Sequence, residues 1–481
     1  LVMLLLLANG YAQKVEEGKA IRLSTREVPL GKIHPVIESF VVSPDGKRFA
    51  YVAKRGKKEL VVVDGKEGKE YDRIGSLTFS SDSKHFVYLA RRGNKWLVVV
   101  DGKEYDEIKD IFSLIFSPDG KRFAYVAMRG KKELVVVDGE EGKEYDRIGG
   151  LSLIFSPDSK RFAYVASRGD KWLVVVDGEE GKEYDGVRDL IFSPDSKRFA
   201  YKARRGNKWL VVVDGEEGKE YDDVWGPIFS PDSKHLAYRA RRGDKWLVVV
   251  NGEEGKEYDV VWDLIFSPDS KHLAYGARRG DKEFVVVDGE EGKEYDDVWD
   301  LIFSPDSKHL AYVARRGDKE FVVVDGEEGK EYDRIGDLIF SPDSKHLAYK
   351  AMRGEKRLVV VDGEEGKEYD VVRGPIFSPD SKRLAYVARR GNKLLVVVDG
   401  EEGKEYDEVW GLIFSPDSKH LAYRARRGNK WFVVVDGEEG KEYDGFLRGS
   451  ELVFDSPNSF HVFARRGIKI FRVEVEIKTI P

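Results

Sequence analysis

A repeat of about 37 residues constrains this chain more than any other feature of its sequence. The tripeptide Ser-Pro-Asp, or a variant of it, recurs eleven times, and its Asp residues are 37 positions apart in nine of the ten steps. A twelfth, degenerate copy carries Asn458, 41 positions after Asp417. Units of this length bury their apolar surface against neighbouring copies. We therefore expect one periodic array of twelve units, not the roughly three independent domains that 481 residues suggest by length alone.

Each copy contains four short segments with the composition of β-strands, as residues 301–333 show. The apolar run 301–303 ends at a Ser-Pro-Asp-Ser turn, and residues 309–314 place apolar side chains on both faces of a second strand. A Gly-Asp hairpin turn leads to the β-branched run 321–324, and the polar segment 330–333 follows a further turn. Because the middle strands are apolar on both faces, they need cover on both sides. Copies stacked about 10 Å apart provide that cover.

The fold class predicted from these units is all-β, a β-propeller of about twelve four-stranded antiparallel blades. An open solenoid is the alternative, but it needs distinct capping units. Glu16-Glu17-Gly18-Lys19 copies the segment that precedes each fourth strand, whereas the last repeat ends after its third strand. We therefore expect residues 13–35, and within them about 17–23, to supply the outer strand that closes the twelfth blade, with the propeller spanning residues 36–481.

Twelve copies are compatible with one closed ring or with two six-bladed propellers in tandem. Nearly identical repeats predict nearly identical blade interfaces, and the sequence between Asp232 and Asp269 keeps the 37-residue register without a spacer. This favours a single ring, although propellers typically have 4 to 8 blades.

At the level of the single repeat, a family resemblance is visible. The segment FSPDGKRFAYVA at 116–127, followed by LVVVDG, resembles the blade repeat of TolB-type propellers, a WD-repeat-like family, and the match covers roughly residues 36–476. The resemblance implies a periplasmic or extracellular interaction platform, or a non-catalytic gate on a peptidase. The chain departs from the family in its number of blades, because TolB resembles a six-bladed ring and this sequence has twelve repeats.

The N-terminal residues have the pattern of an export signal. Leu1 to Ala8 form the one long apolar run, too short to span a bilayer as a helix, and Gly10 and Ala12 are the small residues expected before a cleavage site. We expect residues 1–12 to be a truncated signal peptide and the protein to be periplasmic or extracellular. A buried N-terminal strand is the alternative.

Composition excludes several classes of function. The chain has no Cys, so disulfides and thiolate chemistry are excluded, and 82 Lys and Arg against 88 Asp and Glu give no basic surface for a nucleic acid. His85, His235, His272, His309, His346, His420 and His461 are assigned to one repeat position, after Lys or Phe460, where Arg substitutes freely. A residue interchangeable with Arg is not a metal ligand or tuned base. We therefore expect no enzymatic activity, metal or cofactor.

The candidate binding residues are the variable ones at a single end of the blades. All nine Trp lie at two repeat positions there, the start of the third strand and the linker before the first strand, and Arg takes the second position in two copies. We expect these residues to bind a protein, peptide or glycan; the alternative is packing between blades. They are Trp96, Trp172, Trp209, Trp246 and Trp431 at the first position, and Trp225, Trp262, Trp299, Trp410, Arg188 and Arg373 at the second.

The predicted function is an exported, non-enzymatic interaction or scaffold propeller. A structural protein that forms rings, stacks or a pore by self-assembly of its faces is the second hypothesis.

Overall fold

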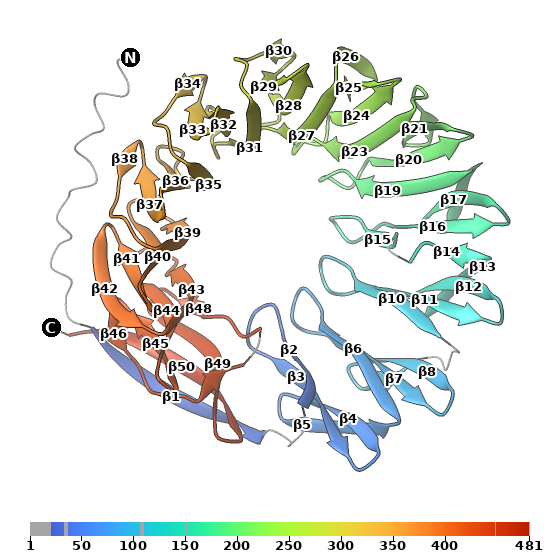
Figure 1. Cartoon of the computed structure of the whole chain (residues 1–481). Helices are drawn as coiled ribbons and strands as arrows, with labels where there is room; N and C mark the ends of the chain where they lie inside the picture. The colour runs from blue at the N-terminus through green and yellow to red at the C-terminus, as the bar shows by residue number, and fades with distance from the viewer. Residues whose placement is uncertain (1–20, 33–36, 106–109, 151, 448, 481) are drawn as a thin grey trace. The chain divides into compact units, whose positions relative to one another are not determined.

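The computed structural model of the chain describes residues 21–32, 37–105, 110–150, 152–447 and 449–480. Within these ranges the protein consists of twelve antiparallel sheets (Figure 1). Their strands pair in chain order, except in the fourth and twelfth blades, where a split first strand places two pieces against the same second strand, and at the N-terminal strand, which joins the last blade. This confirms the predicted fold class, an all-β β-propeller of twelve four-stranded blades. The described ranges contain no helix able to cross a membrane.

The blades fall into two compact units, which are described separately. Residues 34–329 form a unit of eight blades within the described part of the chain. In blade four the first strand is split into two pieces. The strands are β2 (Ile37–Val42), β3 (Phe49–Arg55), β4 (Lys58–Val63) and β5 (Lys66–Tyr71) in blade one; β6 (Arg73–Phe79), β7 (Phe86–Arg92), β8 (Lys95–Val100) and β9 (Lys103–Glu104) in blade two; β10 (Ile111–Phe116), β11 (Phe123–Arg129), β12 (Lys132–Val137) and β13 (Glu140–Tyr145) in blade three; β14 (Arg147–Ile148), β15 (Ile154–Phe155), β16 (Phe162–Arg168), β17 (Lys171–Val176) and β18 (Glu179–Tyr184) in blade four; β19 (Gly186–Phe192), β20 (Phe199–Arg205), β21 (Lys208–Val213) and β22 (Glu216–Glu217) in blade five; β23 (Asp223–Phe229), β24 (Leu236–Arg242), β25 (Lys245–Val250) and β26 (Glu253–Tyr258) in blade six; β27 (Val260–Phe266), β28 (Leu273–Arg279), β29 (Lys282–Val287) and β30 (Glu290–Glu291) in blade seven; and β31 (Asp297–Phe303), β32 (Leu310–Arg316), β33 (Lys319–Val324) and β34 (Glu327–Glu328) in blade eight.

Residues 330–481 and the N-terminal stretch 1–33 form the second unit, which has four blades in its described part. Its strands are β35 (Arg334–Phe340), β36 (Leu347–Arg353), β37 (Lys356–Val361) and β38 (Glu364–Glu365) in blade nine; β39 (Val371–Phe377), β40 (Leu384–Arg390), β41 (Lys393–Val398) and β42 (Glu401–Tyr406) in blade ten; β43 (Glu408–Phe414), β44 (Leu421–Arg427), β45 (Lys430–Val435) and β46 (Glu438–Glu439) in blade eleven; and β47 (Gly445–Phe446), β48 (Val453–Ser456), β49 (Ser459–Arg466), β50 (Lys469–Thr479) and β1 (Ile21–Lys32) in blade twelve.

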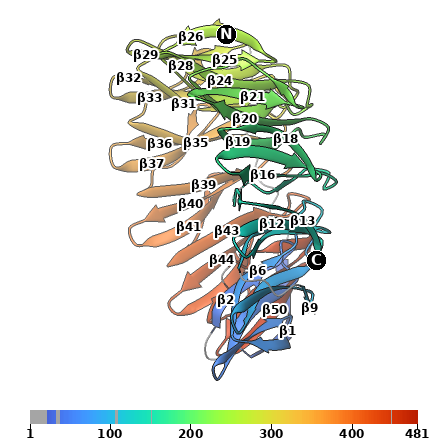
Figure 2. The same ribbon diagram turned by 90° about the vertical axis from the view of Figure 1, so that its right-hand side faces the viewer.

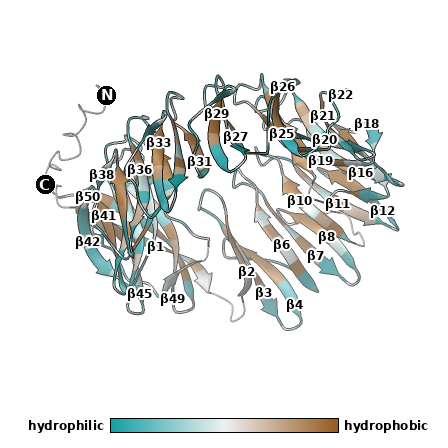
Figure 3. Cartoon of the chain, turned by 45° about the horizontal axis from the view of Figure 1, so that its top comes forward, coloured by the Kyte–Doolittle hydropathy of each residue, from teal (hydrophilic) through white to brown (hydrophobic). Residues whose placement is uncertain are grey.

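The core lies between successive blades, because the second and third strands are apolar on both faces. Between blades six and seven, Ala237 and Val248 pack against Val261 and Tyr275, all of them buried. In the eight-bladed unit the blades stack sheet against sheet (Figure 2), and the strand centres are hydrophobic while the turns are hydrophilic (Figure 3). The core between the sixth and seventh blades is continuous, so no junction of the kind that two six-bladed propellers require is found there.

The Ser-Pro-Asp-Ser turns also link neighbouring blades. In blade six the Ser230 hydroxyl donates to the Asp232 carboxylate at 2.7 Å, which fixes the turn. The backbone N–H of Asp232 donates to the hydroxyl oxygen of Ser270, in the turn of blade seven, at 2.9 Å. The near invariance of this motif is therefore explained by the interface between blades.

A second link joins the outer strands and is called here the Tyr–Glu–Arg cluster. Glu254 of blade six accepts hydrogen bonds from Arg242 of its own blade at 2.7 Å and from the Tyr221 hydroxyl of blade five at 2.9 Å. These bonds lower the pKa of Glu254 to about 2. The same arrangement recurs at Glu104, Glu180, Glu217, Glu291, Glu365, Glu402 and Glu439.

In blade twelve the outer strand is the N-terminal strand β1. It pairs antiparallel with β50, from Ile21 opposite Thr479 to Lys32 opposite Lys469. Glu27 of β1 occupies the acidic position of the Tyr–Glu–Arg cluster, where it accepts from Tyr443 and Arg466, both at 3.0 Å. The Glu-Glu-Gly-Lys segment at 16–19 and the signal-peptide prediction for residues 1–12 lie outside the described residues.

Candidate functional site

The residues singled out from the sequence lie at one end of the blades, called here the linker end. This end carries the Arg-Gly turns between second and third strands and the linkers between blades. Each Trp of the first group is the second residue of a third strand, as Trp209 is in β21. The second group, together with Arg188 and Arg373, is the third residue of a first strand, as Trp225 is in β23.

The third-strand Trp are half-buried. Trp96, Trp172, Trp209 and Trp246 pack against the cores between blades. In three blades the second-strand Arg opposite the Trp lies over its ring: Arg204 at 5.7 Å from Trp209, Arg241 at 5.9 Å from Trp246 and Arg426 at 5.9 Å from Trp431. In these blades the Trp ring is covered by its own blade.

The first-strand position is shaped by a bulge. The residue after the Trp or Arg has a left-handed backbone, with φ of 58° at Gly226, 48° at Asp263 and 55° at Asp300. The pairing register shifts there, for example between Trp225 and Ile228. A bulge re-aims the adjoining side chain, so neighbouring residues decide where each Trp points.

The exposed fraction of Trp225 is 51%, so about half of its surface contacts solvent. Its indole N–H donates to the Asp223 carboxylate at 2.7 Å. The Lys202 ammonium, which is buried, lies 4.7 Å from the Trp209 ring and 5.2 Å from the Trp225 ring. The same ammonium donates to the carbonyl oxygen of Val224 at 2.9 Å. Trp225 is therefore both exposed and fixed in orientation.

Trp410, in the other unit, is held in a comparable way. It is 54% exposed, and its indole N–H donates to Glu408 at 3.1 Å. Arg424, opposite Trp410 on β44, donates to the carbonyl oxygen of Ser450. In both blades an acidic residue lies two positions before the exposed Trp, and an Arg lies across the sheet from it, Arg239 opposite Trp225 and Arg424 opposite Trp410.

Trp262 has the opposite orientation. It lies over Gly276 of the neighbouring strand, where a Cβ atom would meet the indole Cε2 at 2.4 Å. Its indole N–H donates to the carbonyl oxygen of Val298 in blade eight at 3.3 Å. This carbonyl corresponds to that of Val224, which accepts from Lys202, so Trp262 replaces a basic side chain between blades. Trp299, opposite Val313, is half-buried.

Arg188 and Arg373 are exposed, and one further aromatic residue belongs with them. Phe112 is 43% exposed and occupies the same first-strand position in blade three, opposite Val126. It precedes Phe116 by four residues, as Trp225 precedes Phe229. Aligning the repeats on the Phe that ends each first strand identifies Phe112 from the sequence. A comparison restricted to Trp and Arg misses it.

The histidines have a structural explanation, with one correction. Nδ1 of each of six His contacts the Asp or Asn that starts the third-to-fourth turn, as His309 does with Asp325 at 2.6 Å. Placing His461 in this group was wrong. The pairing of Arg466 with Lys469 puts Ser459 at the shared position, because the first turn of blade twelve is a short hairpin. His461 is fully buried and contacts Asp455 at 2.7 Å.

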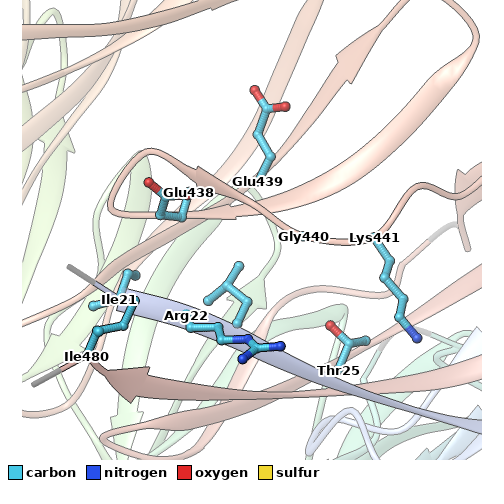
Figure 4. Close-up of a pocket in the computed structure, with 9 residues that line it drawn as sticks. Ile21, Arg22, Thr25, Glu438, Glu439, Gly440, Lys441 and Ile480 are labelled. Carbon is cyan, nitrogen blue, oxygen red and sulfur yellow. The ribbon is translucent and has the colours of Figure 1, made fainter.

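A shallow hollow of about 390 Å³ lies beside β1, between it and the outer strand of blade eleven (Figure 4). Among its lining residues, Glu439 already accepts from Arg427 and Tyr406. In the described part of the chain, no group of three His, Asp or Glu side chains is arranged to hold a metal ion.

No family model matches the chain, and no curated protein matches it. Solved structures similar to it include a crystal structure of the eukaryotic initiation factor, at 14% identity and a TM-score of 0.37, over 69% of this chain and 95% of that one. TolB from Acinetobacter baumannii is similar at 14% identity and a TM-score of 0.24, over 55% and 78%. The β-propeller domain of the Trilobed protease from Pyrococcus furiosus is similar at 14% identity and a TM-score of 0.26, over 55% and 96%. These similarities concern the β-propeller fold alone.

Proposed function

We propose that this protein is a non-enzymatic interaction scaffold that binds a protein or peptide partner at the linker end of its blades. The observation that carries the proposal is Trp225, whose indole is half exposed yet held by Asp223 and Lys202. Exposed aromatic and Arg side chains contribute most to binding in protein interfaces, and a fixed side chain loses little entropy on binding.

The contrast between the two ends of the blades supports this choice. At the opposite end the Ser-Pro-Asp-Ser turns are engaged in bonds between blades, as Asp232 is with Ser270. At the linker end the first-strand position varies, and it holds exposed Phe112, Arg188 and Trp225 in the eight-bladed unit. Apart from the His and Arg exchange at the start of the second strands, variation is concentrated at the linker end, and such concentration on a uniform scaffold is typical of a recognition surface.

We further propose export to the periplasm or the cell exterior, on the resemblance of the repeat to TolB-type propellers and on the apolar N-terminal run.

A glycan is the alternative ligand, because flat aromatic rings also suit sugars.

Self-assembly is the second candidate function, and one observation favours it. Ile468 stands at the tip of the Arg-Gly turn of blade twelve, where other blades carry Asn, Asp, Lys or Glu, and is 60% exposed. An apolar turn tip at the linker end suits contact between copies of the chain.

The test uses the full chain against an array of immobilised peptides and glycans. Trp225→Ala combined with Phe112→Ala should abolish the binding seen with the wild type, while Trp262→Phe, in the interblade position, should retain it. Equal binding by all three proteins would refute the proposed surface. Light scattering of the wild type and of Ile468→Asp tests self-assembly. If copies of the chain associate through this turn, the wild type forms multimers and Ile468→Asp does not.

A further inference from the structure

Blade four differs from the other Trp-bearing blades in what lies opposite its third-strand Trp. In blades five, six and eleven an Arg is opposite the Trp and covers the ring. In blade four the opposite residue is Ser167, which is buried and too short to cover Trp172. The side chain that shields Trp209, Trp246 and Trp431 is therefore absent from Trp172.

A hollow of about 430 Å³ opens at this place, at the linker end of blades four and five. Trp172 and Ser167 line it from blade four, and Arg204 lines it from blade five. Arg147, the first residue of β14 and the neighbour of Ser167 across the sheet, contributes a second guanidinium.

The charges in this hollow are unbalanced in favour of the two arginines. Asp146 is paired with Lys132 at 2.5 Å and Asp185 with Lys171 at 2.6 Å, so each of these carboxylates has a Lys partner. The hydrogen bond from Lys171 lowers the pKa of Asp185, and the charge of Arg204 also acts on Asp185 and lowers its pKa. Among the described residues, no carboxylate lies within ion-pair distance of Arg147 or Arg204; Arg204 donates only to the backbone carbonyl of Asp185, at 3.1 Å. Asp170, on the turn, is the one remaining acidic residue of the lining.

We propose that this hollow binds an acidic peptide segment: Arg147 and Arg204 donate to a side-chain carboxylate, and the Trp172 ring supports the adjoining apolar side chain. Guanidinium groups recognise planar carboxylates through paired, charge-assisted hydrogen bonds, and aromatic rings add an apolar contact surface. The inference rests on the proposed function and assigns the chemistry of the partner at blades four and five.

The test measures fluorescence anisotropy of labelled peptides with the full-length protein. The probe is an acetylated Gly-Phe-Glu-Phe-Glu-Gly peptide, compared with its glutamine counterpart and with a version carrying phosphoserine in place of glutamate. We expect the glutamate peptide to bind at least about tenfold more tightly than the glutamine peptide, and Arg147→Gln and Arg204→Gln each to weaken it about tenfold. A preference for phosphoserine would overturn the assignment to a carboxylate.

Matched variants separate this site from general electrostatics and from the Trp225 surface. Arg73→Gln and Arg241→Gln remove the same charge at the equivalent positions of blades two and six and should leave the affinity unchanged. Ser167→Arg adds a positive charge, but the new side chain covers Trp172 as the corresponding Arg covers the Trp ring in blades five, six and eleven. We therefore expect Ser167→Arg to weaken binding. Unchanged or stronger binding by Ser167→Arg overturns the proposal. If binding is lost only in the Trp225→Ala, Phe112→Ala protein, the proposed function holds and this inference fails.

Discussion

The hydroxyl of Tyr443 donates to the carboxylate of Glu27, 416 positions earlier in the sequence, at 3.0 Å. Arg466 donates to the same carboxylate, also at 3.0 Å. Burial disfavours the charged form of Glu27, but the bonds from Arg466 and Tyr443 outweigh it and hold its pKa below the usual range. The two ends of the chain are thus joined by the same cluster that links consecutive blades elsewhere.

Glu27→Gln should therefore destabilise the protein, by about 1.5–3 kcal/mol, because a charged hydrogen-bond acceptor is lost in a partly buried site. Urea denaturation gives the free energy of unfolding, and hydrogen exchange reports whether β50 loses protection. Glu476→Gln, on the exposed face of β50, is the control and should change the stability little. Equal stability of the two variants would show that Glu27 does not hold β1 in place.

Trp262 and Trp225 should differ in their effect on stability although they occupy the same repeat position. Trp262→Ala removes an interblade hydrogen bond and a half-buried ring, so we expect a loss of about 2–4 kcal/mol. Trp225→Ala should cost no more than about 1 kcal/mol, because its ring is half exposed. Thermal and urea unfolding of the two variants measure the difference; a larger loss for Trp225→Ala would contradict the assigned orientations.

Gly276 and Trp262 should show strong coupling. Gly276→Ala alone places a Cβ atom against the indole and is expected to destabilise by about 1–3 kcal/mol. In the Trp262→Ala background, Gly276→Arg should instead restore stability, because Arg239 at the equivalent position donates to Val261 at 2.9 Å. A double-mutant cycle measures this coupling. Simple additivity of the two substitutions would show that the basic side chain and the Trp are not interchangeable.

Stability should fall in acid as the Tyr–Glu–Arg clusters are protonated. The pKa of Glu217, Glu254 and Glu291 is lowered to about 2 from 4.5 by hydrogen bonds from Arg and Tyr. A lowered folded-state pKa means that the stabilisation is complete above pH 4.5 and is lost as the pH falls from 4.5 toward 2. Urea midpoints between pH 7 and pH 2 measure this loss. Glu254→Gln should lower the midpoint at pH 7 and flatten its pH dependence, whereas Glu253→Gln, at an exposed position, should leave both unchanged.

Much of the blade could be predicted from the sequence because its determinants are local. The Ser-Pro-Asp-Ser and Asp-Gly turns, and strands apolar on both faces, specify four strands and the need for neighbours within a single 37-residue unit. The register of the twelfth copy could not be predicted in this way. Its degenerate Ser-Pro-Asn turn is a shorter hairpin, which moves His461 two positions along the strand and into the core.

The sequence by itself determined the number of blades, their strand order and the end at which they vary. The tertiary structure alone decided which Trp are exposed and which residue of the N-terminal strand joins blade twelve. Trp225 and Trp262 occupy the same repeat position. Beyond the local exchange of Asp223 for Val260, their orientations differ because Lys202 faces one from the preceding blade while Gly276 leaves room for the other across the sheet. Such contacts depend on residues that only folding brings together, just as it brings Glu27 to Tyr443.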